Sequence, residues 1–410
     1  MSTKRVALLA VLTVLFSFSA SLLFAEIILR AHDWYKGSQA GAQQLSQALP
    51  YEFSPVRHHR LIPNARYRHQ ESEYDYVWAN NSLGMRDRER LYHKDPDSFR
   101  ILFLGDSMIQ GYGVPLEQSM VYRLEASLNQ PPREKIVEVL NAGVFGYGPL
   151  LEYRFLQELL PMVEPDVVLV GFFLGNDVGD DYFYTGQLVR GEDGLFYFAD
   201  MKWPWDYRNE VLNAMTSEAA DQPKTNRGRS YFSSLRGYLG SIPRRTHIWR
   251  TIKEIRDRRR KERDHRENNE RIAKLIEERK DDIRINLGLV NYPIGTKKQR
   301  LEYWQLSHSY LKKMHQACQA SGVPMVLVVI PILEAKENQF EEPYEVLDEI
   351  GRELQIPVIQ LLSGLSRWPL EEFVYKVDGH WNAEGNRRAA IVLDKELRKL
   401  NVLPAPLRPE

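Results

Sequence analysis

The sequence predicts an α/β protein in which helices cover a parallel sheet, and two observations lead to this fold class. Short apolar runs rich in branched residues are typical of strands buried on both faces. They occupy residues 100–104, 136–140, 166–173, 325–330 and 356–361. Between and after them lie stretches with helical character at residues 119–128, 150–160, 301–320 and 343–354, and a further helix is expected from Asn382 or Ala383. Alternation of strands with helices indicates a parallel sheet.

The composition is that of a chain that folds around a core. Its 410 residues are 43% hydrophobic and 27% charged, and 55 basic residues balance 55 acidic ones. A net charge of zero gives no global attraction to nucleic acid, so no nucleic-acid partner is expected. The single cysteine, Cys318, excludes an intramolecular disulfide and a cysteine-based zinc cluster. It is expected to be a small buried residue on a helix.

The N-terminal region has the features of a membrane anchor. Residues 6–25 carry no charge, and twenty helical residues span about 30 Å, the thickness of a bilayer core. Lys4 and Arg5 precede them, which predicts a cytoplasmic N-terminus and an extracytoplasmic remainder, expected in a bacterial periplasm. A cleaved signal peptide is the alternative. The predicted anchor is residues 1–30, and the chain is expected to contact the membrane through this helix.

The rest of the chain divides into two parts. Residues 31–97 are polar and aromatic and are expected to form a stalk and cap without a core, although residues 67–70 and 74–78 could pair as short strands. Residues 98–410 form the main domain. A helical insertion is expected at about residues 180–298, because about 150 residues separate the third and fourth strands. Within it, residues 256–271 contain thirteen charged residues and predict a solvated helix.

Small or polar residues follow three of the predicted strands, where ligands of open parallel sheets bind. Ser107 follows the first strand, Gly146 the second and Asn176 the third, and His380 comes late in the chain with Asp378 two positions before it. Acyl transfer requires a nucleophile, a base, a group that orients the base and donors for the oxyanion. Ser107 would be the nucleophile, His380 the base and Asp378 its orienter. The backbone N–H groups of Ser107 and Gly146 and the amide of Asn176 would form the oxyanion hole.

These residues resemble the SGNH hydrolases, also called the GDSL esterase and lipase family. Ser107, Gly146, Asn176 and His380 match the four residues that give the family its name, in the same order, and the resemblance covers roughly residues 98–400 apart from the insertion. It implies a flavodoxin-like three-layer sandwich with a five-stranded parallel sheet of order 2-1-3-4-5, and ester hydrolysis through an acyl-serine. The family usually has its acid three residues before the histidine, where this chain has Val377. A dyad oriented by a backbone carbonyl is therefore an alternative to Asp378.

The expected function is serine ester hydrolysis of O-acyl groups on an extracytoplasmic small molecule or glycan. Residues 81–86 look like those of anchored bacterial members of the family, which are often linked with cell-surface polysaccharide, so acetylated polysaccharide is a candidate substrate. Two alternatives stay open, an O-acyltransferase that uses the same residues and a decayed carbohydrate-binding or assembly scaffold. No cofactor and no metal are expected, because the chain has no phosphate loop, dinucleotide fingerprint or metal-ligand spacing. Asp106 is expected to brace the turn before Ser107.

Overall fold

The computed structural model describes residues 50–131, 135–201, 256, 297–331, 341–366, 368–369, 372–376 and 378–404. All of these except Arg256 belong to one compact unit. The predicted anchor at residues 1–30 lies outside the described residues. Most of the predicted insertion also lies outside them, including the predicted charged helix except for Arg256. In the part of the chain that the structure describes, no helix combines the length and the apolar character that a membrane span needs.

The centre of the compact unit is a five-stranded parallel sheet. Its strands are β5 (Ser98–Gly105), β6 (Ile136–Gly143), β7 (Val167–Phe173), β10 (Met325–Ile330) and β11 (Val358–Gln360). They lie side by side in the order β11-β10-β7-β5-β6, and every neighbouring pair is parallel. Numbered along the chain, this is the order 2-1-3-4-5, so the predicted fold class and strand order are confirmed.

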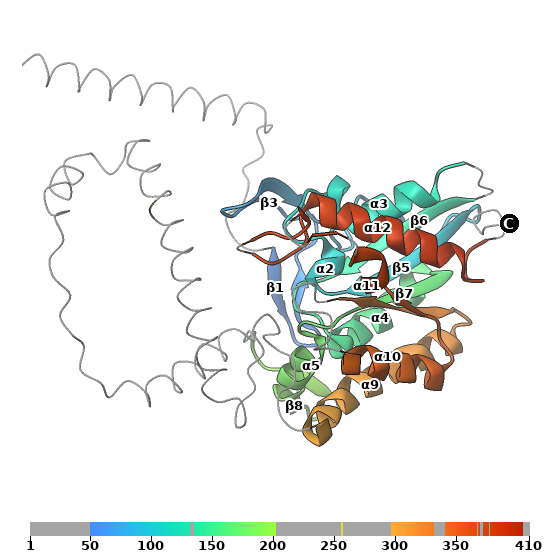
Figure 1. The fold of residues 1–410 in the computed structure, drawn as a ribbon. Helices are drawn as coiled ribbons and strands as arrows, with labels where there is room; N and C mark the ends of the chain where they lie inside the picture. Colours follow the sequence, from blue (N-terminus) through green and yellow to red (C-terminus); the bar gives the residue numbers. More distant parts are fainter. Residues whose placement is uncertain are drawn as a thin grey trace, which may run out of the picture. The chain divides into compact units, whose positions relative to one another are not determined.

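Helices cover both faces of the sheet and make three layers (Figure 1). The helices are α2 (Ser107–Gln110), α3 (Met120–Leu128), α4 (Pro149–Val163), α5 (Asp177–Thr185), α9 (Lys297–Ala320), α10 (Glu341–Leu354), α11 (Leu362–Leu365) and α12 (Ala383–Arg398), with a 3-10 turn at Leu116–Gln118. One core joins the sheet to α2, α3, α11 and α12, and a second joins it to α4, α9 and α10. Cys318 is buried in the second core, as predicted.

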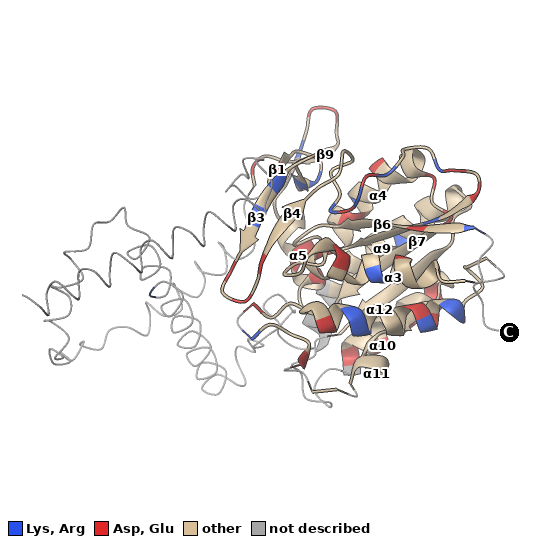
Figure 2. Ribbon diagram, turned by 90° about the horizontal axis from the view of Figure 1, so that it is seen from above, with Lys and Arg blue, Asp and Glu red and all other residues tan. Residues whose placement is uncertain are grey.

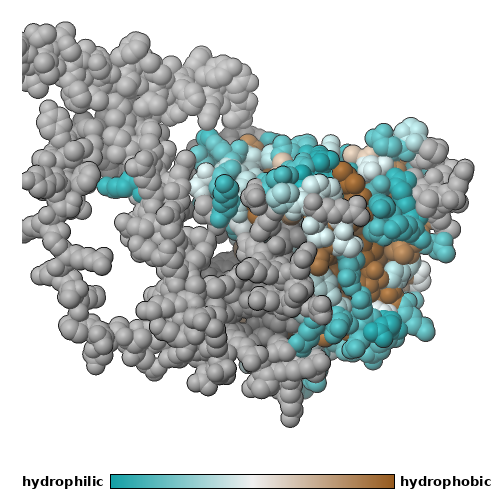
Figure 3. Space-filling view, viewed as in Figure 1, coloured by the Kyte–Doolittle hydropathy of each residue, from teal (hydrophilic) through white to brown (hydrophobic). Residues whose placement is uncertain are grey.

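Helix α12 shows how local sequence sets an element that carries the site. The side chain of Asn382 accepts the backbone N–H groups of Glu384 and Gly385, at 2.9 and 3.1 Å, and so caps the helix where the sequence predicted its start. The buried residues of α12 face α3 and the sheet. Hydrophilic residues cover the outer surfaces of α12 and α10, and hydrophobic residues lie between the two helices (Figure 3). The helix that follows the His380 loop is therefore fixed at its first turn.

The segment before the sheet forms two hairpins. β1 (Tyr51–Ser54) pairs with β2 (His58–Leu61), and β3 (Arg66–Gln70) pairs with β4 (Asp75–Ala79), which confirms the predicted pairing of residues 67–70 with 74–78. A third hairpin, β8 (Leu188–Arg190) with β9 (Phe196–Phe198), follows α5.

The expectation of a segment without a core is wrong for residues 50–97. Alternate residues of β3 and β4 are buried, and Trp78 and Met85 belong to the larger hydrophobic core. Period-two burial on strands of five residues gives only a weak sequence signal, and here the buried positions are aromatic residues and a histidine rather than aliphatic residues. This segment is part of the compact unit rather than a stalk.

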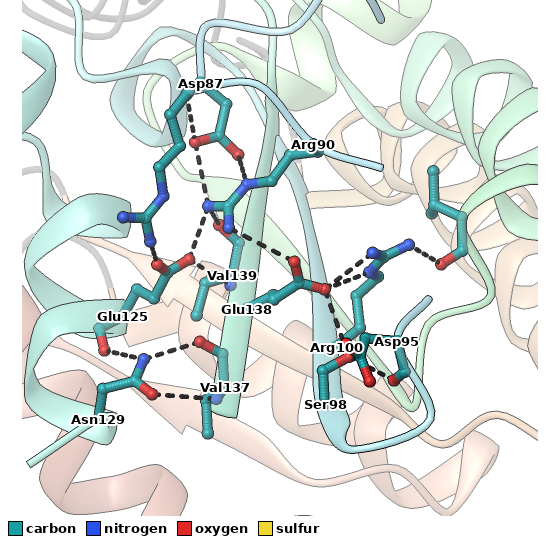
Figure 4. Close-up of polar contacts among 12 residues, drawn as sticks. Asp87, Arg90, Asp95, Ser98, Arg100, Glu125, Asn129, Val137, Glu138 and Val139 are labelled. Carbon is teal, nitrogen blue, oxygen red and sulfur yellow. Dashed lines mark hydrogen bonds and ion pairs between the residues drawn. The ribbon is translucent and has the colours of Figure 1, made fainter. Parts of the chain in front are cut away.

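A buried network of charges ties the segment before β5 to α3 and β6 (Figure 4). The guanidinium of Arg90 donates to Asp87 at 2.9 and 3.1 Å and to Glu125 at 2.6 Å. The same oxygen of Glu125 accepts the backbone N–H of Val139 at 2.8 Å. Arg100, 1% exposed, donates to Glu138 at 2.8 Å. Because these charges are paired inside the protein, the loss of one partner leaves a buried charge with one counter-charge fewer.

We expect Glu125→Ala to lower the free energy of unfolding by about 3 kcal/mol, because Arg90 then keeps a buried charge without this carboxylate and the Val139 N–H loses its acceptor. Urea denaturation measures the change. The matched control is Glu52→Ala, which breaks an exposed pair with Arg60 and should cost less than about 1 kcal/mol. Equal losses in the two variants would contradict a structural role for the buried network.

Candidate active site

Ser107 lies at the carboxyl end of β5, as the first residue of α2. Glycines let the chain close tightly there: a Cβ at Gly105 would lie 2.2 Å from a side-chain carbon of Ile109, and one at Gly143 would lie 2.2 Å from the backbone nitrogen of Gln110. Asp106 caps the helix, since its Oδ1 accepts the Met108 N–H at 2.8 Å. The predicted brace is confirmed, and it holds Ser107 at the turn.

The structure brings together Ser107, His380 and Asp378. The Nε2 atom of His380 lies 2.8 Å from the Ser107 Oγ, and its Nδ1 atom lies 2.5 Å from Asp378 Oδ1. A carboxylate can only accept, so Nδ1 carries the proton of the neutral ring and Nε2 accepts from the serine hydroxyl. The three side chains thus form one chain of hydrogen bonds.

A turn explains how an acid two positions before the histidine reaches the ring. Gly379 has φ +83°, in the left-handed region that glycine adopts without strain. The backbone N–H of His380 also donates to Asp378 Oδ1, at 3.2 Å, and the N–H of Gly379 donates to the Tyr375 carbonyl, at 3.0 Å. On an extended strand, adjacent positions point to opposite sides. Here the turn folds Asp378 back toward the Nδ1 atom of the ring. Val377 lies outside the described residues.

The charge of Asp378 makes the imidazole of His380 more basic. Burial lowers the pKa of His380, but the charge and hydrogen bond of Asp378 outweigh burial and raise this pKa above its usual value. Burial alone would raise the pKa of Asp378, yet His380 and further hydrogen bonds hold it below its usual value. Burial raises the pKa of Asp106 to about 6, despite the Met108 N–H. The site therefore keeps Asp378 ionised beside a basic imidazole.

The predicted oxyanion donors lie in elements that the sheet brings to the same edge. Gly146 has φ +70° in the turn between β6 and α4. Asn176 precedes α5, and one N–H of its side-chain amide donates to Asp180 at 2.7 Å. The second N–H of the same amide is the group predicted to bind the oxyanion. Ser107 is at the first helical position of α2, where the backbone N–H has no partner within the helix. The roles of these three groups as donors stay predictions.

Sequence reasoning missed His59, which contacts the peptide group before Gly146. His59 Nε2 lies 2.7 Å from the Phe145 carbonyl oxygen, which can only accept, so Nε2 carries a proton. Its Nδ1 then accepts from His58 Nδ1, 2.8 Å away. Burial lowers the pKa of His59 well below its usual value and keeps it neutral. The Phe145 carbonyl and the Gly146 N–H share one planar peptide, so His59 sets the direction of that N–H.

Sequence reasoning also missed Glu73 and Tyr74, at the tip of the β3–β4 hairpin. The Tyr74 hydroxyl donates to Asp378 Oδ2 at 2.9 Å, and the Glu73 carboxylate accepts backbone N–H groups of Lys376 and Asp378. No local pattern signals contacts between residues more than 300 positions apart.

Fold and site together define a class of protein: a doubly wound α/β protein with a hydrogen-bonded serine, histidine and aspartate at the carboxyl ends of its strands. No protein-family model and no curated protein matches the chain.

Several solved structures are similar to the chain. A putative lipolytic protein of the G-D-S-L family from Desulfitobacterium hafniense matches at 14% identity over 74% of this chain and 99% of its own, with a TM-score of 0.36. A catalytic mutant of an acetylxylan esterase from Geobacillus stearothermophilus matches at 12% identity over 75% of this chain and 97% of its own, with a TM-score of 0.37. A two-domain esterase active on acetylated mannans matches at 14% identity over 76% of this chain and 53% of its own, with a TM-score of 0.34. Similarity this low assigns no activity or substrate to this chain.

Proposed function

We propose that the chain is a serine ester hydrolase of the SGNH type that cleaves O-acyl esters of an extracytoplasmic substrate. The observation that carries this proposal is the continuous hydrogen-bonded path from Ser107 Oγ through His380 to Asp378. It supplies the nucleophile, base and orienting acid that acyl transfer needs. The order of Ser107, Gly146, Asn176 and His380 along the chain, which resembles that of the SGNH hydrolases, favours carboxylic esters.

In the first half of the reaction, the Ser107 oxygen attacks the ester carbonyl while His380 Nε2 takes the serine proton. The charge of Asp378 stabilises the imidazolium that forms, and the imidazolium then protonates the leaving alcohol. In the second half, water attacks the acyl-serine with the same base. The acid is released and Ser107 recovers its proton.

The negative charge on the carbonyl oxygen needs donors that are in place before the reaction. The backbone N–H groups of Ser107 and Gly146 and the remaining amide N–H of Asn176 are the groups proposed for this role. Loss of one such donor typically lowers turnover by about a hundredfold or more. The peptide held by His59 would keep the Gly146 N–H fixed without reorganisation during the reaction.

We further propose that the substrate is a surface glycan ester or a small ester outside the cytoplasm, with acetylated polysaccharide as the first candidate. Two sequence features support this: the uncharged residues 6–25 behind Lys4 and Arg5, and the likeness of residues 81–86 to anchored bacterial members of the SGNH family.

The decisive experiment combines active-site titration with substrate profiling of the full-length chain. A fluorophosphonate should label one equivalent of serine, which peptide mapping should place at Ser107. Esters of graded acyl length and acetylated glycans then define the acyl group. A chain that neither reacts with the fluorophosphonate nor cleaves any of these esters would contradict the proposed function and favour a scaffold.

The pH dependence of the reaction follows from the raised pKa of His380. The base must be unprotonated, so kcat/KM should increase with pH, and the midpoint of that increase should lie above 6.5, the usual pKa of histidine. Steady-state kinetics from pH 5 to 9 measures the midpoint. The control, His93→Gln, changes an exposed histidine outside the site and should keep the same midpoint. A midpoint at or below 6.5 would contradict the assignment of His380 as a base raised by Asp378.

A further inference from the structure

The tip of the β3–β4 hairpin contacts the loop that carries His380. Acidic residues mark this tip (Figure 2). Glu73 Oε1 accepts the backbone N–H of Lys376 at 2.8 Å, and its Oε2 accepts that of Asp378 at 3.0 Å. One carboxylate therefore holds two backbone groups of the loop, on either side of a single intervening residue.

Tyr74, next in the chain, contacts the side chain of Asp378. Its hydroxyl donates to Asp378 Oδ2 at 2.9 Å, while Oδ1 faces His380 Nδ1 at 2.5 Å. Both oxygens of the carboxylate are thus engaged, one by the base and one by the hairpin. Burial raises the pKa of Tyr74 well above its usual value, so the hydroxyl stays protonated and remains a donor.

The ring of Tyr74 is itself held in place. Tyr74 is 8% exposed and packs against His69 and Tyr375, with ring centroids 5.0 and 5.2 Å away. The hydroxyl of Tyr375 donates to the Gly113 carbonyl at 2.9 Å, which ties this part of the loop to the segment after α2. A donor on a packed ring defines the direction of the group that accepts from it.

We propose that Tyr74 is a positioning residue for the reaction of Ser107: its hydroxyl holds the Asp378 carboxylate with Oδ1 toward His380, while Glu73 fixes the backbone of the same loop. This inference rests on the proposed function. It assigns part of the active site to the segment that precedes the sheet. Tyr74 acts on the rate through Asp378 and His380 and does not touch the reacting atoms, so its loss affects kcat rather than substrate binding.

The first test is Tyr74→Phe, which removes only the hydroxyl. We expect kcat to fall about tenfold, equivalent to about 1.4 kcal/mol, with KM within twofold of the parent. The matched control is Tyr76→Phe on β4. Tyr76 has the same 8% exposure, and its hydroxyl bonds to His69 and to the Gly113 N–H rather than to Asp378. The control should keep kcat within twofold. Unchanged kcat in Tyr74→Phe, or an equal loss in both variants, would overturn the proposal.

A double-mutant cycle separates positioning from a general structural effect. In an Asp378→Asn background, Tyr74→Phe should change kcat on an activated ester by less than twofold, because the carboxylate it holds is gone. A full tenfold loss in that background would overturn the proposal.

Amide hydrogen exchange tests the contact without any substrate. Exchange at His380, whose backbone N–H donates to Asp378 Oδ1, should be at least fivefold faster in Tyr74→Phe and unchanged in Tyr76→Phe. Unchanged exchange in Tyr74→Phe would overturn the proposal. If exchange changes as expected but the parent chain cleaves no ester, the contact stands and the proposed function fails.

Discussion

We expect Ser107→Ala to abolish cleavage of carboxylic esters and labelling by a fluorophosphonate, with little loss of stability. The hydroxyl oxygen is the only non-hydrogen atom that the substitution removes, and its contact in the described structure is with His380 Nε2 at 2.8 Å. Without that oxygen no acyl-serine forms, and what remains is the modest acceleration from binding and the oxyanion donors. Initial rates on the best ester and thermal unfolding of both proteins measure the two effects.

The matched control is Ser119→Ala. Ser119 is also a buried serine at the start of a helix, where its Oγ accepts the Tyr122 N–H and donates to the Leu116 carbonyl. Loss of this cap should cost about 1 kcal/mol of stability and leave turnover close to that of the parent. Turnover of Ser107→Ala within a few-fold of the parent would refute the assignment of the nucleophile.

We expect Asp378→Asn to lower kcat by about ten-thousandfold, as the corresponding change does in other serine triads. The amide keeps the size of the side chain and can still accept from the ring, but it has no charge to stabilise the imidazolium. The fall in kcat should come with a shift of the acid limb of kcat/KM to lower pH, because the charge and hydrogen bond of Asp378 are what raise the pKa of His380.

The control for this variant is Asp75→Asn on the same hairpin that contacts Asp378. Asp75 pairs with Arg68 at the surface, so its loss should change neither kcat nor the acid limb. An Asp378→Asn variant that keeps more than about a tenth of the parental kcat would leave Ser107 and His380 as a dyad with another orienter.

The sheet and its helices could be predicted from the sequence because their signals are local. Residues 325–330 form an unbroken apolar run and became β10 with the predicted bounds, and Asn382 marks the start of α12. The strand order was implied by the family resemblance rather than by periodicity. The contact between Asp378 and His380 could not be derived from spacing, since it depends on the left-handed conformation of Gly379.

What the sequence did not reveal are contacts between distant segments. Glu73 and Tyr74 have no local motif, and their partners in the His380 loop are 303 to 305 residues away. His59 and Phe145 are 86 residues apart. Such pairs form when a hairpin meets a loop that comes from a distant part of the chain, and contacts of this kind depend on the whole fold.

The long connection between β7 and β10 has an entropic consequence. These strands are direct neighbours, paired from Met325 with Val168 to Ile330 with Phe173, although about 150 residues separate them along the chain. Loop-closure entropy grows only with the logarithm of length, so a connection five times longer than a crossover of about 30 residues costs about 1.4 kcal/mol more. One well-buried leucine side chain contributes about as much. The connection between β7 and β10 can therefore vary widely in length at little cost in stability. Insertions and deletions in this connection can be selected without loss of the fold.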